Sequence, residues 1–388
     1  MKSIKVVGLG AACANGVTKE EIFASIRQGS SAILESGLAV LSENQWQQIS
    51  TDCPEEFRDS RCSLLNVHSL KAALKEAGWS PTELHETGFI FASTTSQIDQ
   101  WEKHLPFYKT SGYDLEKIKS SVANQSLGTP ALKLAKFFGI NGPVSLITSS
   151  CTASLQAITM ATLWIRTGKV KRCIVGATEI QSDLTRIGFG SLRLLSKDSA
   201  RPFDKARTGI NLGEGSAFMC LEESTLRLEN PWGFITGIGL STDAYHATSP
   251  HPEGLGSQRA IEMALDNSKV SADEIKWIYS HGTGSPANDL AEAKAIHKIF
   301  PHRPFVTSTK SSHGHTLGAS GALESVLGLM AMKEQVILPT AHCENVDENI
   351  NLEVLKETLS QTYRHFLKNS LGFGGINASV VFSAEAQS

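Results

Sequence analysis

The sequence predicts an α/β protein built from two similar halves. Short apolar runs alternate with stretches of helical character, which is typical of layered α/β architectures. The chain has 388 residues, more than the roughly 250–300 that one hydrophobic core usually reaches. The run at 235–240 (ITGIGL) also resembles the run at 4–9 (IKVVGL). We therefore expect one half at residues 1–228 and a second at 229–388.

The first half is expected to alternate strands with helices. Apolar runs predict strands at 4–8, 88–93, 143–147, 173–176 and 217–221, and helical patterns lie at 20–28, 69–77 and 152–166. Thr18 is a suitable N-cap for the first helix, because its hydroxyl can accept a bond from a free backbone N–H. Gly78 and Gly168 end the other two helices, since glycine readily adopts the left-handed conformation found there.

The second half repeats this alternation after a join at 224–232, which contains charged residues, Asn and Pro. Strands are predicted at 235–240, 277–280, 305–308 and 378–383, and a helix rich in Gly and Ala at 321–333.

Composition excludes several classes of protein. Hydrophobic residues make up 41%, charged residues 19%, and the net charge is −3, so neither a nucleic acid nor a membrane surface is an expected partner. No apolar stretch is long enough for a membrane span. The seven cysteines are scattered, without a CxxC pair, which argues against a disulfide framework or a zinc site and favours the cytoplasm. In that setting a cysteine with histidines elsewhere is a candidate nucleophile.

Cys151 lies in the segment SSCTASLQA, between a predicted strand and a predicted helix. The free N–H groups and the dipole at a helix N-terminus favour a thiolate, so we expect a lowered pKa. The same N–H groups can hold the oxyanion of a thioester adduct. On these residues alone, a buried cysteine in a tight turn is an equally good interpretation.

Two further segments carry histidines. His281 ends an apolar strand and precedes a Gly turn, and strand ends are where α/β folds meet ligands. Lys310 follows another strand, with His313 and His315 in the loop after it. A metal site is not expected, because the chain has no Cys or carboxylate at a recognisable spacing and Lys310 would repel a cation. Alone, such histidines are more often structural.

Three glycines surround Phe373 in the segment NSLGFGGINAS. A strand follows, so this is not the phosphate loop that opens a helix in dinucleotide-binding proteins. A backbone N–H that faces a thioester oxygen is a natural use for such a loop.

Taken together, these motifs resemble the β-ketoacyl-acyl-carrier-protein synthases of the thiolase superfamily. The pattern of that family stands here as Cys151, then HGTGSP from His281, KSSHGH at 310–315 and GFGGIN at 372–377. The segments 201–215 and 243–254 also match, and the order is kept over nearly the whole chain. The resemblance implies a thiolase-like fold, a five-layered α-β-α-β-α sandwich of two similar halves.

The resemblance also implies roles for particular residues. Cys151 would carry the acyl group, while His281 and His315 would assist decarboxylation of malonyl-acyl-carrier protein. The lysine spacing selects His315, which leaves His313 as a departure of open role. The other implied site residues are Lys310 as a further catalytic group, Phe373 with Cys151 for the oxyanion hole and gate, and Glu324, Asp289, Thr283 and Ser285 in support.

Partners and substrates follow from the same resemblance. No cofactor is implied, because the substrates are carried on the phosphopantetheine of acyl-carrier protein, and a homodimer or a heterodimer with a related subunit is expected. Arg201 and Arg207 lie in a basic stretch that would suit an acidic carrier protein, with internal ion pairs as the alternative. Leu371, Ile376 and Ser285 depart from the pattern of the family, so the acyl group stays open.

Two other functions remain as alternatives. A non-catalytic chain-length-factor subunit is one, although such subunits lack the nucleophile that this chain has. A coenzyme A thiolase is the other, but thiolases use a second cysteine, and Cys343 lies outside the expected context. We therefore expect a 3-oxoacyl-acyl-carrier-protein synthase of fatty-acid or polyketide biosynthesis, with aryl polyenes as one possible product class.

Overall fold

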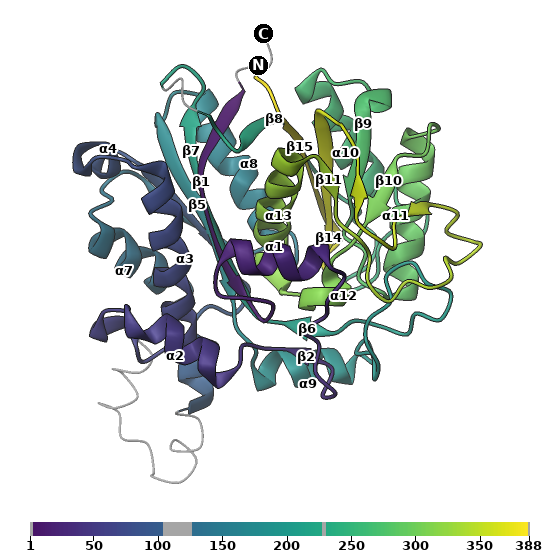
Figure 1. The fold of residues 1–388 in the computed structure, drawn as a ribbon, viewed down its shortest axis with the longest axis horizontal. Coiled ribbons are helices and arrows are strands. Elements are labelled where there is room, and N and C mark those ends of the chain that lie inside the picture. Colours follow the sequence, from purple (N-terminus) through teal and green to yellow (C-terminus); the bar gives the residue numbers. More distant parts are fainter. Residues whose placement is uncertain (1–2, 104–125, 227–229, 387–388) are drawn as a thin grey trace.

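The computed structural model describes residues 3–103, 126–226 and 230–386, and these form five layers. Figure 1 shows helices α8 (Ala153–Arg166) and α13 (Ser320–Glu334) between the two parts of a large sheet. Helix α3 (Arg61–Ala77) packs outside one part, and α10 (Leu255–Ser268) packs outside the other. This is the predicted α-β-α-β-α arrangement, with apolar residues filling every interface between layers.

The sheet has eleven strands, and their order is mirrored about its centre. The order is β12-β10-β9-β14-β15-β8-β1-β7-β5-β3-β4. The first half contributes β1 (Ile4–Cys13), β3 (Gly88–Ala92), β4 (Val144–Ile147), β5 (Arg172–Glu179) and β7 (Gly215–Glu223). The second contributes β8 (Gly233–Thr242), β9 (Ile275–Tyr279), β10 (Phe305–Thr307), β12 (Glu353–Val354), β14 (His365–Gly372) and β15 (Ile376–Ser383). The two halves meet where β1 and β8 pair antiparallel, with Ile4 opposite Ile235.

Glycine packing repeats on the two central strands. A Cβ on Gly10 would lie 2.0 Å from the Ser69 carbonyl of α3, and one on Gly239 would lie 1.9 Å from the Ala260 carbonyl of α10. Gly8 and Gly237 make the matching contacts one helical turn further along. The helices therefore approach the two strands in the same way. In this packing Gly8 corresponds to Gly237, whereas the short sequence repeat aligns Gly8 with Gly239. The structural match is therefore shifted by two residues from the sequence match.

The remaining helices complete the layers. They are α1 (Lys19–Arg27), α2 (Glu43–Thr51), α4 (Pro81–His85), α7 (Thr129–Phe138), α9 (Asp183–Ser191), α11 (Pro286–Ile299) and α12 (Lys310–His313). Short 3-10 turns occur at Glu55–Phe57, Ala272–Glu274 and Leu317–Ala319, and two small ribbons pair β2 (Leu38–Ala39) with β6 (Leu212–Gly213) and β11 (Val336–Ile337) with β13 (Leu359–Ser360). Among residues 3–103, 126–226 and 230–386, none of the helices combines the length and the apolar composition that a membrane span requires.

Most predicted elements are confirmed, with shifted ends. Thr18 caps α1 in a reciprocal capping box with Glu21, and Gly78 ends α3 in the left-handed conformation. The prediction for α3 was too short, because its first two turns include Asn66 and His68. The predicted loop after Lys310 is instead the short helix α12. The proposed boundary between residues 228 and 229 lies outside the described residues.

Candidate active site

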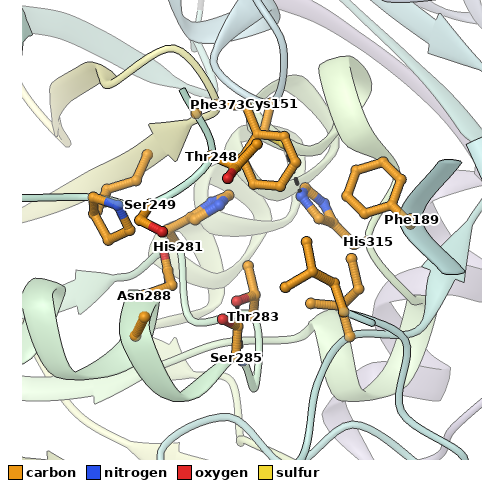
Figure 2. A pocket seen from close by; sticks show the side chains of 16 residues that line it. Cys151, Phe189, Thr248, Ser249, His281, Thr283, Ser285, Asn288, His315 and Phe373 are labelled. Atoms are coloured by element: carbon orange, nitrogen blue, oxygen red, sulfur yellow. Dashed lines mark hydrogen bonds between the residues drawn. The ribbon is translucent and has the colours of Figure 1, made fainter. Parts of the chain in front are cut away.

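Seven separate stretches of the chain contribute side chains to one pocket of ≈ 100 Å³. Figure 2 shows the rings of His281 and His315 in the pocket, with Phe373 and Cys151 above them and Phe189 beside His315. The lining residues are Cys151, Phe189, Leu194, Ile210, Thr248, Ser249, Pro250, His281, Thr283, Ser285, Ala287, Asn288, His315, Leu371, Gly372 and Phe373. The pocket therefore combines three chemically active groups with an apolar wall.

Cys151 is the residue before Thr152, the N-cap of α8, as the sequence predicted. The turn that presents it is tight, because Ser150 has a φ of 47°, in the left-handed region. Cys151 lines the pocket, and the residue is 6% exposed. Its sulfur is therefore reachable only through the pocket.

The three active groups are close enough to act on one substrate atom. His315 Nε2 lies 3.1 Å from Cys151 Sγ. The rings of His281 and His315 are 5.3 Å apart, centroid to centroid. One ring nitrogen of each histidine and the Cys151 sulfur all lie within 4.8 Å of one another. The structure thus brings together the three residues that the motifs singled out.

His281 is held by backbone bonds at the end of β9. Glu292 of α11, fully buried, accepts the backbone N–H groups of His281 and Gly282 at 2.7 and 2.8 Å. The Lys310 ammonium donates to the His281 carbonyl at 2.7 Å. These bonds fix the turn and leave the imidazole free to face the pocket. Sequence reasoning missed Glu292, because one glutamate in a helix gives no motif.

A buried charge network lies behind the histidines. Glu324 of α13 bridges two buried lysines, with 2.5 Å from Oε1 to Lys310 Nζ and 2.5 Å from Oε2 to Lys368 Nζ. The two ammonium groups outweigh burial and lower the pKa of Glu324 to about 2. Burial lowers the pKa of Lys368 to about 8, against the attraction of Glu324. Lys368 was not predicted; its one signal is a lysine inside the apolar strand β14.

Both pocket histidines are neutral at physiological pH. Burial, with the positive charge of Lys310 second, holds the pKa of His281 and that of His315 well below the usual value near 6.5. A neutral imidazole has one N–H donor and one acceptor nitrogen. Each ring can therefore donate a hydrogen bond without carrying a charge.

The expected lowering of the pKa of Cys151 is wrong in sign. Burial raises the pKa of this thiol to about 12, and the Lys310 charge opposes that rise only in part. The backbone N–H groups of Cys151 and Phe373 both bond the sulfur and also favour the thiolate. Because the resting thiol is neutral, it needs a base, and His315 Nε2 is at hydrogen-bond distance.

His313, whose role the sequence left open, is not among the residues that line the pocket. Its Nδ1 donates to the Gly314 carbonyl at 2.6 Å, and its Nε2 lies 2.8 Å from the Thr309 hydroxyl. A carbonyl only accepts, so Nδ1 carries the hydrogen and Nε2 accepts from Thr309. Burial lowers the pKa of His313 to about 4. The residue thus fixes the backbone next to His315.

Phe373 lies in the turn between β14 and β15, between Gly372 and two glycines with positive φ. Its ring stacks on Phe189 of α9, with centroids 5.5 Å apart. Its N–H reaches the Cys151 sulfur, which suits the predicted oxyanion role. Phe189 was not predicted, since one aromatic residue on an exposed helix carries no signal.

Of the predicted supporting residues, Asp289 lies behind the turn that follows His281, and Thr283 and Ser285 lie in the pocket wall. Asp289 is fully buried and accepts the N–H groups of Thr283 and Phe203, so it shapes the turn after His281. Thr283 and Ser285 line the pocket opposite the sulfur.

The two predicted carrier-protein arginines differ. The Arg207 side chain is 6% exposed and pairs with Asp347 at 2.7 Å. The prediction of a carrier contact for Arg207 is therefore wrong, and the internal ion pair explains this residue. The Arg201 side chain is 34% exposed and lies 3.7 Å from Glu344, a loose pair that leaves its charge accessible.

A soft metal ion would find three ligand atoms at Cys151, His281 and His315. The pair of buried lysines works against it, because the same positive charges that lower the histidine pKa values also repel a cation. The residues therefore fit poorly to a resident metal.

Known proteins are similar to this chain in sequence and in fold. The profile of the β-ketoacyl synthase N-terminal domain matches residues 44–226, and that of the C-terminal domain matches residues 232–344. The 3-oxoacyl-(acyl-carrier-protein) synthase 2 of Coxiella burnetii is 30% identical, over 98% of each chain. Nodulation protein E of Rhizobium leguminosarum bv. trifolii is 31% identical, over 98% of this chain and 99% of its own. The solved ishigamide ketosynthase/chain length factor superposes with a TM-score of 0.91 at 26% identity, over 98% and 99%.

Proposed function

The chain belongs to the β-ketoacyl synthase family, and from that premise we propose that it condenses an acyl group with a malonyl unit. Both substrates arrive as thioesters of acyl-carrier protein, and the product is a 3-oxoacyl-acyl-carrier protein. The observation that carries this proposal is the meeting of Cys151, His281 and His315 within 4.8 Å in one buried pocket.

The first half-reaction transfers the acyl group to Cys151. His315 Nε2, 3.1 Å from the sulfur, takes the thiol proton as the sulfur attacks the thioester carbonyl. The backbone N–H groups of Cys151 and Phe373 stabilise the oxyanion. The C–S bond to phosphopantetheine then breaks, and the departing thiolate takes the proton from His315. The imidazole ends this step neutral.

The second half-reaction consumes the malonyl thioester. The bond to its carboxylate breaks, CO2 leaves, and the electron pair moves into an enolate. His281 and His315 each donate a hydrogen bond to the enolate oxygen, and their neutral state supports this role because a charged imidazolium would protonate the carbanion. The carbanion attacks the acyl carbonyl, and the Cys151 sulfur leaves as a thiolate, which takes a proton from solvent.

The buried charge network supports the second step. Lys310, Glu324 and Lys368 place a net positive charge behind both rings. Burial is the main cause of the lowered pKa of each histidine, and the positive charge of Lys310 lowers it further. We assign Lys310 to holding His281 in place through the carbonyl bond of 2.7 Å, and we assign Glu324 to holding Lys310.

The two rival functions fit the pocket less well. A non-catalytic chain-length factor has no need of a cysteine with a base 3.1 Å away. A coenzyme A thiolase needs a second cysteine at the site. All seven cysteines lie in the described residues, and among the pocket-lining residues only Cys151 is a cysteine. Cys343 lies instead in an apolar cluster with Phe203 and Ile350.

The identity of the acyl group is set by the apolar wall. Leu371, Ile210 and the stacked rings of Phe189 and Phe373 surround the sulfur. We propose that a chain longer than the ≈ 100 Å³ pocket enters only when Phe373 swings away from Phe189. The relatives carry names from different pathways, so we leave the pathway as fatty-acid or polyketide synthesis.

We further propose acyl-carrier protein and a second ketosynthase-type chain as partners, with no resident cofactor. Arg201 is the residue that we propose contacts the carrier protein, because its side chain is 34% exposed. A cytoplasmic location is part of this proposal, because the cysteines are all free and the nucleophile must stay reduced.

Intact-mass spectrometry with acyl- and malonyl-carrier proteins tests the function. Wild-type protein should gain the acyl mass, release CO2 and yield the 3-oxoacyl product, whereas Cys151→Ala should gain no acyl mass. Cys173→Ala is the matched control, since Cys173 is buried in β5, away from the pocket-lining residues. An equal acyl adduct on Cys151→Ala and wild type would exclude the proposal.

A further inference from the structure

Ser320 lies behind the imidazole of His315, on the side away from Cys151. Its Oγ is 2.9 Å from His315 Nδ1 and 3.1 Å from the Thr316 hydroxyl, and the residue is fully buried. In a neutral imidazole, one nitrogen carries hydrogen and the other accepts. The partner of Nδ1 therefore determines whether Nε2 can accept from the sulfur or donate to a substrate.

A serine hydroxyl is a special partner, because it can donate or accept. His313 gives the contrast within the same chain segment. The carbonyl that faces its Nδ1 can only accept, so one tautomer is fixed. At His315, Nδ1–H can donate to Ser320 while Ser320 donates to Thr316. The reverse chain, from Thr316 through Ser320 to Nδ1, satisfies the other tautomer equally.

We propose that Ser320 is a positioning residue that lets His315 use both tautomers, one for each half-reaction. This inference rests on the proposed function. During acyl transfer, hydrogen stays on Nδ1, and Nε2 passes the Cys151 proton to the departing phosphopantetheine thiolate. Between the two half-reactions, Nε2 takes a proton from solvent in the pocket and Nδ1 gives its proton to the chain of hydroxyls formed by Ser320 and Thr316, which returns one to solvent, so the ring stays neutral. During decarboxylation, Nε2–H donates to the enolate oxygen, and Nδ1 accepts from Ser320. A partner that only donates or only accepts would favour one half-reaction over the other.

Ser320→Ala separates the two steps. Without the hydroxyl, Nδ1–H would be a buried donor without a partner, which costs more than a bare acceptor. The variant therefore favours hydrogen on Nε2. Acylation of Cys151 by hexanoyl-carrier protein, followed by quench-flow and intact mass, should slow ~10-fold or more. CO2 release from malonyl-carrier protein, measured on protein whose Cys151 is alkylated with iodoacetamide, should change less than ~3-fold.

Two variants serve as controls. Ser320→Thr keeps the hydroxyl and should restore the acylation rate. Ser325→Ala removes another buried hydroxyl from α13, one that donates to the Gly321 carbonyl at 2.6 Å, and should slow neither step.

The outcomes distinguish the inference from the function. If wild-type protein neither gains an acyl group nor releases CO2, the proposed function fails. If wild-type protein is active but Ser320→Ala slows both steps equally, or neither, the function stands and the tautomer role of Ser320 is wrong.

Discussion

Glu324 is the acidic group that two buried lysines share, and it is itself fully enclosed. Removing one partner from a buried ion network leaves charge without compensation. The pKa of the Glu324 carboxyl is about 2 in the folded protein and ~4.3 in the unfolded chain. The ionised carboxylate therefore stabilises the folded state fully at pH values above ~4.3. That stability is lost as the pH falls from ~4.3 toward 2.

Glu324→Gln should lower the free energy of unfolding at pH 7 by ~3–5 kcal/mol, measured by urea titration. The difference from wild type should shrink as the pH falls through that window. Glu334→Gln is the control: its pair with Arg27 is 46% exposed on both sides, so it should change stability by less than ~1 kcal/mol. A Glu324→Gln protein as stable as this control would contradict the bridging role.

At the scale of elements, the mirrored strands β1 and β8 pack against helices α3 and α10 through glycines rather than through large side chains. Backbone carbonyls of α3 and α10 lie where a Cβ on Gly10 or Gly239 would be. Neither helix can move away from the sheet without losing other contacts, because each packs on two or more strands. Adding one methyl group therefore forces backbone movement.

Gly10→Ala and Gly239→Ala should each destabilise the protein by at least ~1–3 kcal/mol, and to a similar extent, because the contacts are equivalent. Thermal unfolding measures this. Gly188→Ala in α9 has no heavy atom within 4 Å of the added methyl group, so it should be neutral or slightly stabilising. Unequal losses at Gly10 and Gly239 would argue against equivalent packing in the two halves.

The sequence predicted elements that carry a local signal and missed those that do not. Cys151, His281, His315 and Lys310 stand in motifs with fixed spacing, and the structure brings them together. Lys368 acts through its ion pair with Glu324 of another layer, which no local pattern encodes. Ser320 contacts His315 and Thr316 a few residues earlier, but one serine among small residues carries no signal. Helix α12 is too short to show a period, so its residues resembled a loop.

Across the whole molecule, the strand β4 ends the large sheet. It pairs with β3 on one side, its residues are half-buried, and no described strand pairs with its other side. Met160 and Leu163 of the neighbouring α8 are 36% and 43% exposed. An open sheet edge beside apolar side chains is a surface that another chain covers, and we assign it to the proposed second ketosynthase-type chain.

Leu163→Glu should therefore shift the particle mass toward one chain in size-exclusion chromatography with light scattering, because it places a charge in the contact. Leu132→Glu of α7, where the leucine is 63% exposed, is the control and should leave the mass unchanged. An unaltered assembly with Leu163→Glu would remove β4 and α8 from the interface.

The position of β1 at the middle of the sheet also sets the timing of biosynthesis. Its partners β7 and β8 begin at Gly215 and Gly233. The first strand to leave the ribosome must wait until more than half of the chain has been made, which at ~5–20 residues per second takes on the order of ten seconds or more. Throughout that time both edges of an apolar strand stay open, so the nascent chain has a prolonged need for chaperone protection.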